Sequence, residues 1–161
     1  MAVNSTLLLR VIRQFRRYYD RQFEGLLAPT GISMREMHVV LFLANNPDCD
    51  TARDVAELRG LAKSQVSAAV DLLAERGFLC RRSDQTDRRV VHLALTDQGT
   101  ALAGAGQRIQ SACVDTLLSG LTQAEAEQFQ TLLEKVLSGA ETYLKEGCLL
   151  YTSPSPRDRS L

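Results

Sequence analysis

Long hydrophobic runs, an excess of either charge, and tryptophan are all missing from this 161-residue sequence. No apolar stretch is long enough to cross a bilayer, and the N-terminus lacks the apolar core and cleavage site of a secretory signal. Nineteen basic residues balance nineteen acidic ones, so no strong overall field attracts a charged partner and any basic binding site must be local. We therefore expect a cytoplasmic globular protein with no membrane partner.

Cysteine and histidine are also scarce. His38 and His92 have no cysteine or carboxylate at a metal-ligand spacing, so we expect no metal site. The sequence has no P-loop, nucleotide-binding glycine motif or Ser-His-Asp pattern, and two histidines leave little material for acid–base chemistry. We predict a protein that is not an enzyme and needs no cofactor. Wide spacing without a C-x-x-C motif predicts free thiols at Cys49, Cys80, Cys113 and Cys148.

The apolar residues recur at intervals of three and four, and capping motifs separate the periodic segments. Ser33 with Glu36 and Thr122 with Glu125 have the spacing of capping boxes, and so does Thr51 with Asp54, where Asp replaces the usual Glu or Gln. Gly77 is suited to a left-handed helix end. These signals predict a mainly α fold with a small two-stranded β-wing. The expected helices cover about residues 5–27, 33–44, 51–60, 63–77, 96–119 and 122–146, and the expected strands cover about 78–83 and 89–95.

The middle of the chain has the order of a winged helix-turn-helix, in which the second helix of the pair enters the DNA major groove. A short helix ends at Gly60, a second helix follows, and the hairpin comes directly after it. A solvated helix start would have a similar composition, but its place between a turn and a wing favours DNA binding. Short polar or cationic side chains suited to phosphates and base edges begin the second helix: Lys63, Ser64, Gln65 and Ser67.

The loop of the hairpin carries positive charge. Arg88 and Arg89 are predicted to reach phosphates or the narrow minor groove, whose negative potential attracts arginine. Asp87 beside them is unfavourable near DNA unless it orients a neighbouring arginine or caps the backbone amides of the loop. We expect Asp87 to orient the wing.

The segment DQTDRRVVHLALTDQG resembles the wing signature of the MarR family of bacterial transcription regulators. Asp87-Arg88-Arg89 matches its Asp-x-Arg pattern, and Leu93 to Gly99 matches Leu-x-Leu-Thr-x-x-Gly. The resemblance covers about residues 5–146 and implies an obligate homodimer with interlocking first, fifth and sixth helices. It also implies a repressor on a pseudo-palindromic operator in double-stranded DNA, often released by a small molecule or a redox signal. Ala68 departs from the pattern, because many relatives carry an arginine after the recognition-helix serine or threonine.

The family resemblance also suggests where an effector would bind, near the junction of the first, second and fifth helices. The expected apolar walls are Phe15, Tyr19, Met37 and Leu41, although an ordinary core without a cavity would use the same residues. Two other functions stay open. Cys80, beside Arg81, would serve a thiol-based redox sensor, and a winged helix can also be a protein-interaction module that does not bind DNA.

Four segments are expected from these patterns. Residues 1–32 form an N-terminal dimerisation helix, 33–98 the DNA-binding region, and 99–146 the C-terminal dimerisation helices. The first and last helices carry more apolar surface than a compact DNA-binding module can cover, which favours a dimer. Residues 147–161 are expected to be a disordered tail, and Cys148 to Asp158 resembles a translated sequencing adapter, which indicates a non-native read-through scar.

Overall fold

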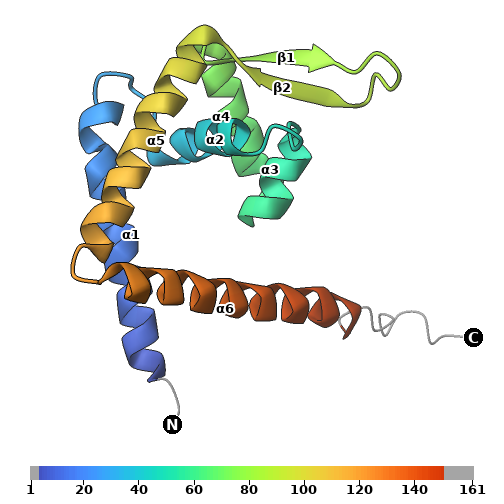
Figure 1. The fold of residues 1–161 in the computed structure, drawn as a ribbon. Helices are drawn as coiled ribbons and strands as arrows, with labels where there is room; N and C mark the ends of the chain where they lie inside the picture. Colours follow the sequence, from blue (N-terminus) through green and yellow to red (C-terminus); the bar gives the residue numbers. More distant parts are fainter. Residues whose placement is uncertain (1–3, 151–161) are drawn as a thin grey trace, which may run out of the picture. The chain divides into compact units, whose positions relative to one another are not determined.

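The computed structural model describes residues 4–150, and the side chains of residues 4–140 (Figure 1). The chain forms two compact units that divide between Asp115 and Thr116. The predicted order of elements is confirmed. The elements are α1 (Ser5–Leu27), α2 (Met34–Asn45), α3 (Ala52–Arg59), α4 (Lys63–Glu75), β1 (Leu79–Ser83), β2 (Val91–Leu95), α5 (Asp97–Leu118) and α6 (Gln123–Leu150).

Capping boxes start two of the helices in the first unit, as predicted. The Ser33 backbone amide donates to Glu36 Oε2 at 2.6 Å, while the Ser33 hydroxyl accepts from the amide of Arg35. Thr51 and Asp54 form the equivalent pair at the start of α3, with the Thr51 amide 3.0 Å from Asp54 Oδ2. Each box satisfies backbone donors that the first helical turn leaves without a partner. The helix starts are therefore determined locally.

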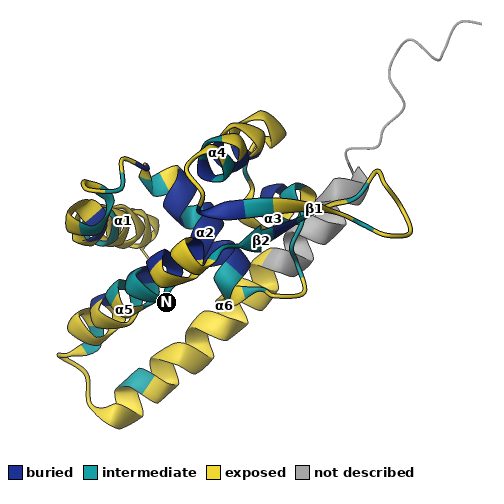
Figure 2. Ribbon diagram, turned by 90° about the horizontal axis from the view of Figure 1, so that it is seen from above, coloured by how far each residue is buried: buried dark blue, intermediate teal, exposed yellow. Residues whose placement is uncertain are grey.

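The core of the first unit surrounds α2, most of which is buried (Figure 2). Helices α1, α3 and α4 and strand β2 all pack against it. From α1, only Phe23 is fully buried among the described residues. The largest fully buried side chains are Phe23, Met37, Leu41, Leu73, Val39, Val40, Val55, Val66, Val70 and Cys113.

The hairpin is antiparallel, with Leu79 opposite Leu95 and Ser83 opposite Val91. Both strands begin slightly later than the sequence predicts, at residues 79 and 91 rather than 78 and 89. The amide of Phe78 still completes the end of α4 by donating to the carbonyl of Leu73. The amide of Val90 turns back to the carbonyl of Asp87 within the loop. Turn hydrogen bonds thus occupy groups that the predicted strands would have used.

Helix α6 continues to Leu150, three residues past residue 147, where the predicted tail begins. Gly147 lowers helix propensity without ending the helix, and the first proline of the segment is Pro154. Residues 151–161, the rest of the predicted tail, lie outside the described residues.

Two glycines of α5 allow other segments of the same chain to approach the helix closely. A Cβ built on Gly99 would lie 1.9 Å from the carbonyl oxygen of Phe78, at the junction of α4 and β1. A Cβ on Gly106 would lie 2.2 Å from Met37 Cε and 3.1 Å from Leu41 Cδ2. The contact at Gly99 involves backbone, which a rotamer change cannot relieve. Only glycine fits between the start of α5 and the base of the wing.

We predict opposite effects for two glycine substitutions in the same helix. Gly99→Ala forces a methyl group against the Phe78 carbonyl and should lower the free energy of unfolding by about 1–3 kcal/mol. Gly104→Ala is the matched control, because its nearest neighbour is the flexible end of Arg108 at 3.8 Å. It should raise the free energy of unfolding by about 0.5–1 kcal/mol through helix propensity. Urea unfolding of both variants measures the difference, and equal stabilities would contradict the close approach.

Candidate nucleic-acid interface

The helix-turn-helix consists of α3, a turn at Gly60 and α4. Gly60 has φ +62°, a left-handed conformation that glycine adopts without steric cost, and it ends α3 sharply. The amide of Leu61 then donates to the carbonyl of Ala56 at 3.0 Å. Two residues later α4 begins, and it packs against both α2 and α3. The turn therefore fixes α4 against the core while leaving its outer face open.

Helix α4 has a buried apolar side and, at its N-terminal end, an exposed polar side. Val66, Ala69, Val70 and Leu73 are buried, at the spacing of one helical face. The four residues predicted to contact DNA are all exposed on the other side: Lys63, Ser64, Gln65 and Ser67. Gln65 has a second role, because its side-chain oxygen accepts from the backbone amide of Ala62 at 3.4 Å and closes the helix start.

The wing lies beside the exposed face of α4. The guanidinium of Arg81 on β1 forms an ion pair with the carboxylate of Asp71 on α4. Asp71 follows Ser67 by four residues and Ser64 by seven, so all three lie on one helical face. Both partners of the ion pair are more than one-third exposed, so solvent screening makes its stabilising effect small. The ion pair instead helps to position the wing, because it joins β1 to α4, the predicted recognition helix.

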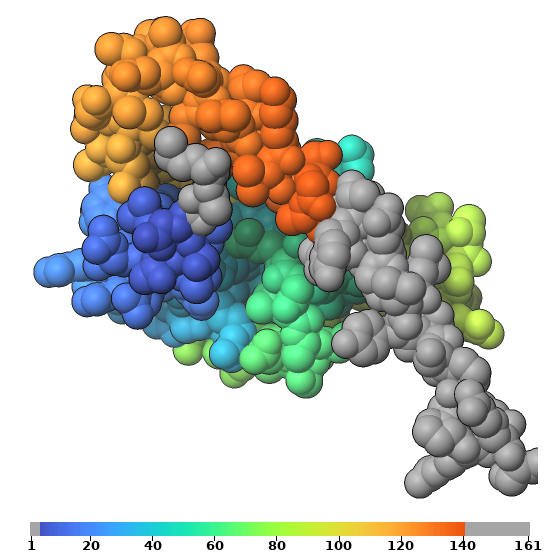
Figure 3. All heavy atoms as spheres, turned by 90° about the horizontal axis from the view of Figure 1, so that it is seen from below, coloured from blue at the N-terminus to red at the C-terminus, as the bar shows by residue number. Residues whose placement is uncertain are grey.

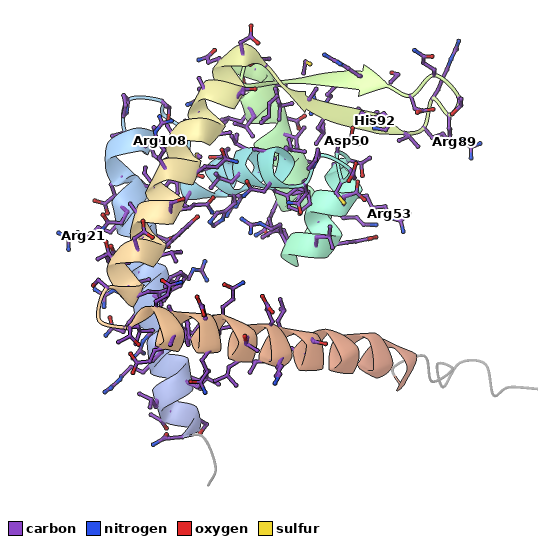
Figure 4. All side chains as sticks on the ribbon, in the orientation of Figure 1. Arg21, Asp50, Arg53, Arg89, His92 and Arg108 are labelled. Carbon is purple, nitrogen blue, oxygen red and sulfur yellow. The ribbon has the colours of Figure 1, made fainter. Side chains whose placement is uncertain are left out.

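Carboxylates organise the wing loop. Asp84 Oδ1 accepts from the backbone amides of Thr86 and Asp87 at 2.7 and 2.8 Å. Asp87 Oδ1 in turn accepts from the backbone amide of Arg89 at 2.9 Å. Of the two roles considered for Asp87, this geometry corresponds to capping of the loop amides. The side chains of Arg88 and Arg89 are left exposed, and Figure 4 shows Arg89 in the loop that joins the strands.

His92 has no partner at a recognisable spacing in the sequence, but in the folded chain it has two. Its Nδ1 lies 2.7 Å from Asp50 Oδ1, and its Nε2 lies 3.2 Å from Asp84 Oδ2. Hydrogen bonds to Asp50, and then to Asp84, raise the pKa of His92. The Thr86 hydroxyl, the amides of Asp87 and Thr86, and His92 lower the pKa of Asp84. Sequence spacing missed this cluster because Asp50 lies on a different element, far from His92 along the chain.

The four residues expected around an effector have different environments. Met37 and Leu41 are buried in the core beneath Gly106. The Tyr19 ring lies between Phe15 and Phe23, with ring centroids 6.0 and 4.9 Å away. The Tyr19 hydroxyl accepts from Gln110 Nε2 at 2.7 Å, and its pKa is raised mainly by burial. Phe15 is exposed on α1. The residues thus run from the closed core to the surface of α1.

Cys49, Cys80 and Cys113 are free thiols, as predicted, and Cys148 lies beyond the described side chains. Cys113 is buried in α5, and burial raises the pKa of its thiol. Cys49 and Cys80 are half-buried. Among the described residues, no group of three or more histidine, cysteine, aspartate or glutamate side chains is arranged to hold a metal ion. None of the described helices is long and apolar enough to span a membrane.

The fold and this surface define a winged helix-turn-helix protein. A model of the MarR family matches residues 30–90. The chain is 28% identical over 147 residues to the HTH-type transcriptional repressor MdtR of Bacillus subtilis, in an alignment that covers 88% of this chain and 90% of MdtR. These similarities support a place for the chain among the MarR-family regulators.

Two solved structures with a similar fold contain a bound partner, DNA in one and a small molecule in the other. The S. aureus MepR–DNA complex has a TM-score of 0.69 and 25% sequence identity, covering 87% of this chain and 99% of MepR. CouR from Rhodococcus jostii RHA1 bound to p-coumaroyl-CoA has a TM-score of 0.64 and 28% identity, covering 81% of this chain and 88% of CouR.

We predict that Cys113 is the slowest of Cys49, Cys80 and Cys113 to react with iodoacetamide. Its burial blocks access, and its raised pKa leaves little of the reactive thiolate. Peptide mass spectrometry after brief labelling of the native protein measures the rate at each thiol separately. The control is labelling in denaturant, where the three rates should become similar. Labelling of native Cys113 as fast as Cys80 would contradict the buried environment.

Proposed function

We propose that the protein is a homodimeric DNA-binding transcriptional repressor of the cytoplasm, released from its operator by a small molecule. The observation that carries this proposal is the pairing of an exposed polar face on α4 with an arginine-bearing wing beside it. An exposed apolar patch on α4 would favour a protein-interaction module, and the described outer face of its first turns is polar instead. The DNA complex of the similar MepR supports the same function.

In this proposal α4 enters the major groove. Lys63, Ser64, Gln65 and Ser67 contact phosphates and base edges from its first two turns. Arg88 and Arg89 of the wing reach phosphates or the adjacent minor groove. Asp87 orients the wing by holding the backbone amide of Arg89. Because the net charge of the chain is zero, these local cations supply the attraction to DNA.

The dimer is proposed to form through α1, α5 and α6, which correspond to the predicted segments 1–32 and 99–146. Both terminal helices carry apolar side chains with no cover in a single chain. Figure 3 shows the N-terminal part of α1 on the molecular surface. Its large exposed apolar residues are Leu7, Leu8, Leu9, Val11, Ile12 and Phe15, and those of α6 are Phe129, Leu132, Leu133, Val136 and Leu137. A two-fold dimer then places two α4 helices on half-sites roughly 10 bp apart.

The effector is proposed to bind near Phe15, Tyr19, Met37 and Leu41. Phe15 and Tyr19 offer aromatic surface at the edge of the core, and the Tyr19 hydroxyl offers a hydrogen-bonding group. The ligand-bound CouR supports an effector with an aromatic group. Helix α1 and strand β2 both pack on α2, so α2 connects the proposed effector site to the wing.

We predict that Arg89→Ala weakens DNA binding by about 1–3 kcal/mol and lowers the salt slope by about 1 for each phosphate that the side chain neutralises. Arg108→Ala removes the same charge from α5, away from the wing, and should leave the affinity close to that of the wild type (Figure 4). Fluorescence anisotropy with operator DNA at several salt concentrations measures both quantities. Equal affinity of Arg89→Ala and the wild type at physiological salt would contradict the role of the wing.

Asp87→Ala separates two opposing effects at the same loop. Removing a negative charge near DNA should tighten binding, whereas losing the hydrogen bond to the Arg89 amide should loosen the wing and weaken it. We expect weaker binding, and an Asp87→Ala/Arg89→Ala variant that loses less affinity than the sum of the two single changes. The same anisotropy titration measures all three variants. Tighter binding by Asp87→Ala would show that charge repulsion outweighs orientation.

We predict that Val136→Asp disrupts the dimer while Thr131→Asp does not. Both substitutions replace a β-branched residue of α6 with aspartate. Val136 lies on the exposed apolar face, at 68% exposure, and Thr131 lies on the polar side, where its hydroxyl donates to the Glu127 carbonyl. Sedimentation equilibrium over a dilution series measures the association. An undiminished dimer in Val136→Asp would contradict the use of this face.

A further inference from the structure

His92 lies where three segments of the first unit meet. Asp50 belongs to the loop before α3, Asp84 follows β1 at the start of the wing loop, and His92 is on β2 between them (Figure 4). The imidazole Nδ1 is 2.7 Å from Asp50 Oδ1 and Nε2 is 3.2 Å from Asp84 Oδ2. Backbone contacts hold the same junction, since the Leu93 amide donates to the Asp50 carbonyl at 2.7 Å. His92 is therefore held between two carboxylates from different segments.

The protonation state of His92 decides whether this arrangement is stable. A carboxylate accepts hydrogen bonds and donates none, so both ring nitrogens must carry a proton to bond both partners. Only the imidazolium ion has two N–H donors. In the neutral ring one nitrogen would present a lone pair to a carboxylate oxygen, which is repulsive. The geometry thus corresponds to the protonated side chain and is lost in part when the proton leaves.

We propose that His92 is a positioning residue of the wing: its imidazolium joins Asp50 to Asp84, and loss of its proton loosens the wing and weakens DNA binding. This inference rests on the proposed function for its effect on DNA, and on geometry alone for its effect on the wing.

A continuous set of hydrogen bonds leads from His92 to the exposed arginines. Asp84 binds the amides of Thr86 and Asp87, and Asp87 binds the amide of Arg89. On the other side, Asp50 precedes Thr51, the residue that caps α3. Protonated His92 therefore connects the start of the helix-turn-helix to the loop that carries Arg89. Without that connection, the bond between Arg81 and Asp71 still holds β1 to α4, but the loop loses one of its supports.

The charged groups around His92 favour its protonation. Asp50 and Asp84 face it directly and raise its pKa, in that order of importance. Partial burial of the ring opposes protonation, and Arg82, its cross-strand partner on β1, is an exposed cation. Asp54 of α3 is engaged by Thr51. The anions prevail because they bond the ring directly, whereas water screens the exposed guanidinium.

The raised pKa determines the direction of the pH effect. A group whose folded-state pKa is raised contributes its stabilisation below the unfolded value, about 6.5 for histidine, and loses it as the pH rises through the folded value. The pKa of Asp84 is lowered, so this carboxylate stays ionised throughout that range. DNA phosphates add further negative potential, which again favours the proton. Linkage then requires DNA to bind the protonated form more tightly.

The first experiment follows the two histidines of the chain by NMR between pH 5 and 9. His38→Gln assigns the signals, because His38 and His92 are the only histidines present. We expect His92 to titrate above the ordinary histidine value and His38 below it, since burial lowers the pKa of His38. Asp50→Asn keeps the shape of the side chain, removes its charge, and should lower the pKa of His92. A His92 pKa at or below the ordinary value, or one unaffected by Asp50→Asn, would overturn the proposal.

The second experiment measures operator affinity over the same pH range. Wild-type affinity should fall as the pH rises, by about tenfold for each unit by which DNA raises the pKa of His92. His92→Gln should show a flatter profile, Asp50→Asn a fall at lower pH, and His38→Gln the wild-type profile. A wild-type pH profile in His92→Gln would overturn the inference and leave the proposed function standing.

A third measurement needs no DNA. Trypsin cleaves after Arg88 and Arg89, so the rate of cleavage in the wing reports how well the loop is held. The ratio of the His92→Gln rate to the wild-type rate should be largest at low pH and approach one at high pH. A ratio independent of pH would overturn the inference. If no DNA binding is found at any pH, the proposed function fails, and this ratio together with the histidine titration still decides whether His92 holds the wing.

Discussion

The burial of α2 is the constraint on which the first unit depends. Its apolar residues face several directions, so the helix cannot be stable with one side in water. Helices α1, α3 and α4 and strand β2 therefore pack around it, and α5 approaches closely enough that Gly106 has no room for a Cβ beside Met37. This packing fixes the inner side of the helix-turn-helix and leaves the outer face of α4 free.

The surface proposed to bind DNA is built on that rigid body in two different ways. On α4 the polar side chains are presented by helix geometry alone, because the opposite side is buried. The wing has no such core of its own. Leu79 and Leu93 anchor its base in the core, and its outer part depends on side-chain bonds, through Arg81 to Asp71 and through His92 to Asp50. If His92 holds the wing as proposed, the wing is the part of this surface that responds to pH.

Zero net charge gives these local bonds their importance. A strongly basic protein would attract DNA through its overall field, whereas this chain must present a few cations in the right place. Acidic residues at the same surface are consistent with this need, because each has a partner. Asp71 pairs with the Arg81 guanidinium, while Asp84 and Asp87 accept hydrogen bonds from amides of the loop. Two of these carboxylates bond arginine residues directly, Asp71 at the Arg81 guanidinium and Asp87 at the Arg89 amide.

The sequence by itself determined the elements, since their signals are local. Helices α2 and α3 start at capping boxes, formed by Ser33 with Glu36 and by Thr51 with Asp54. The left-handed glycines Gly60 and Gly77 follow the ends of α3 and α4. Each of these signals involves residues that are close together in the sequence. Apolar spacing also identified the outer face of α4, and the wing motif identified the arginine loop. Strand limits were less accurate because turn hydrogen bonds compete with strand pairing.

Only the tertiary structure decided which distant groups meet. His92 has no partner near it in the sequence, and folding places it between Asp50 and Asp84. In the sequence, Gly99 is only a residue with low helix propensity. In the folded chain, glycine is the one residue type that fits there, because a Cβ would clash with the Phe78 carbonyl. Contacts of this kind depend on how separate elements pack, and neither periodicity nor capping motifs carry that information.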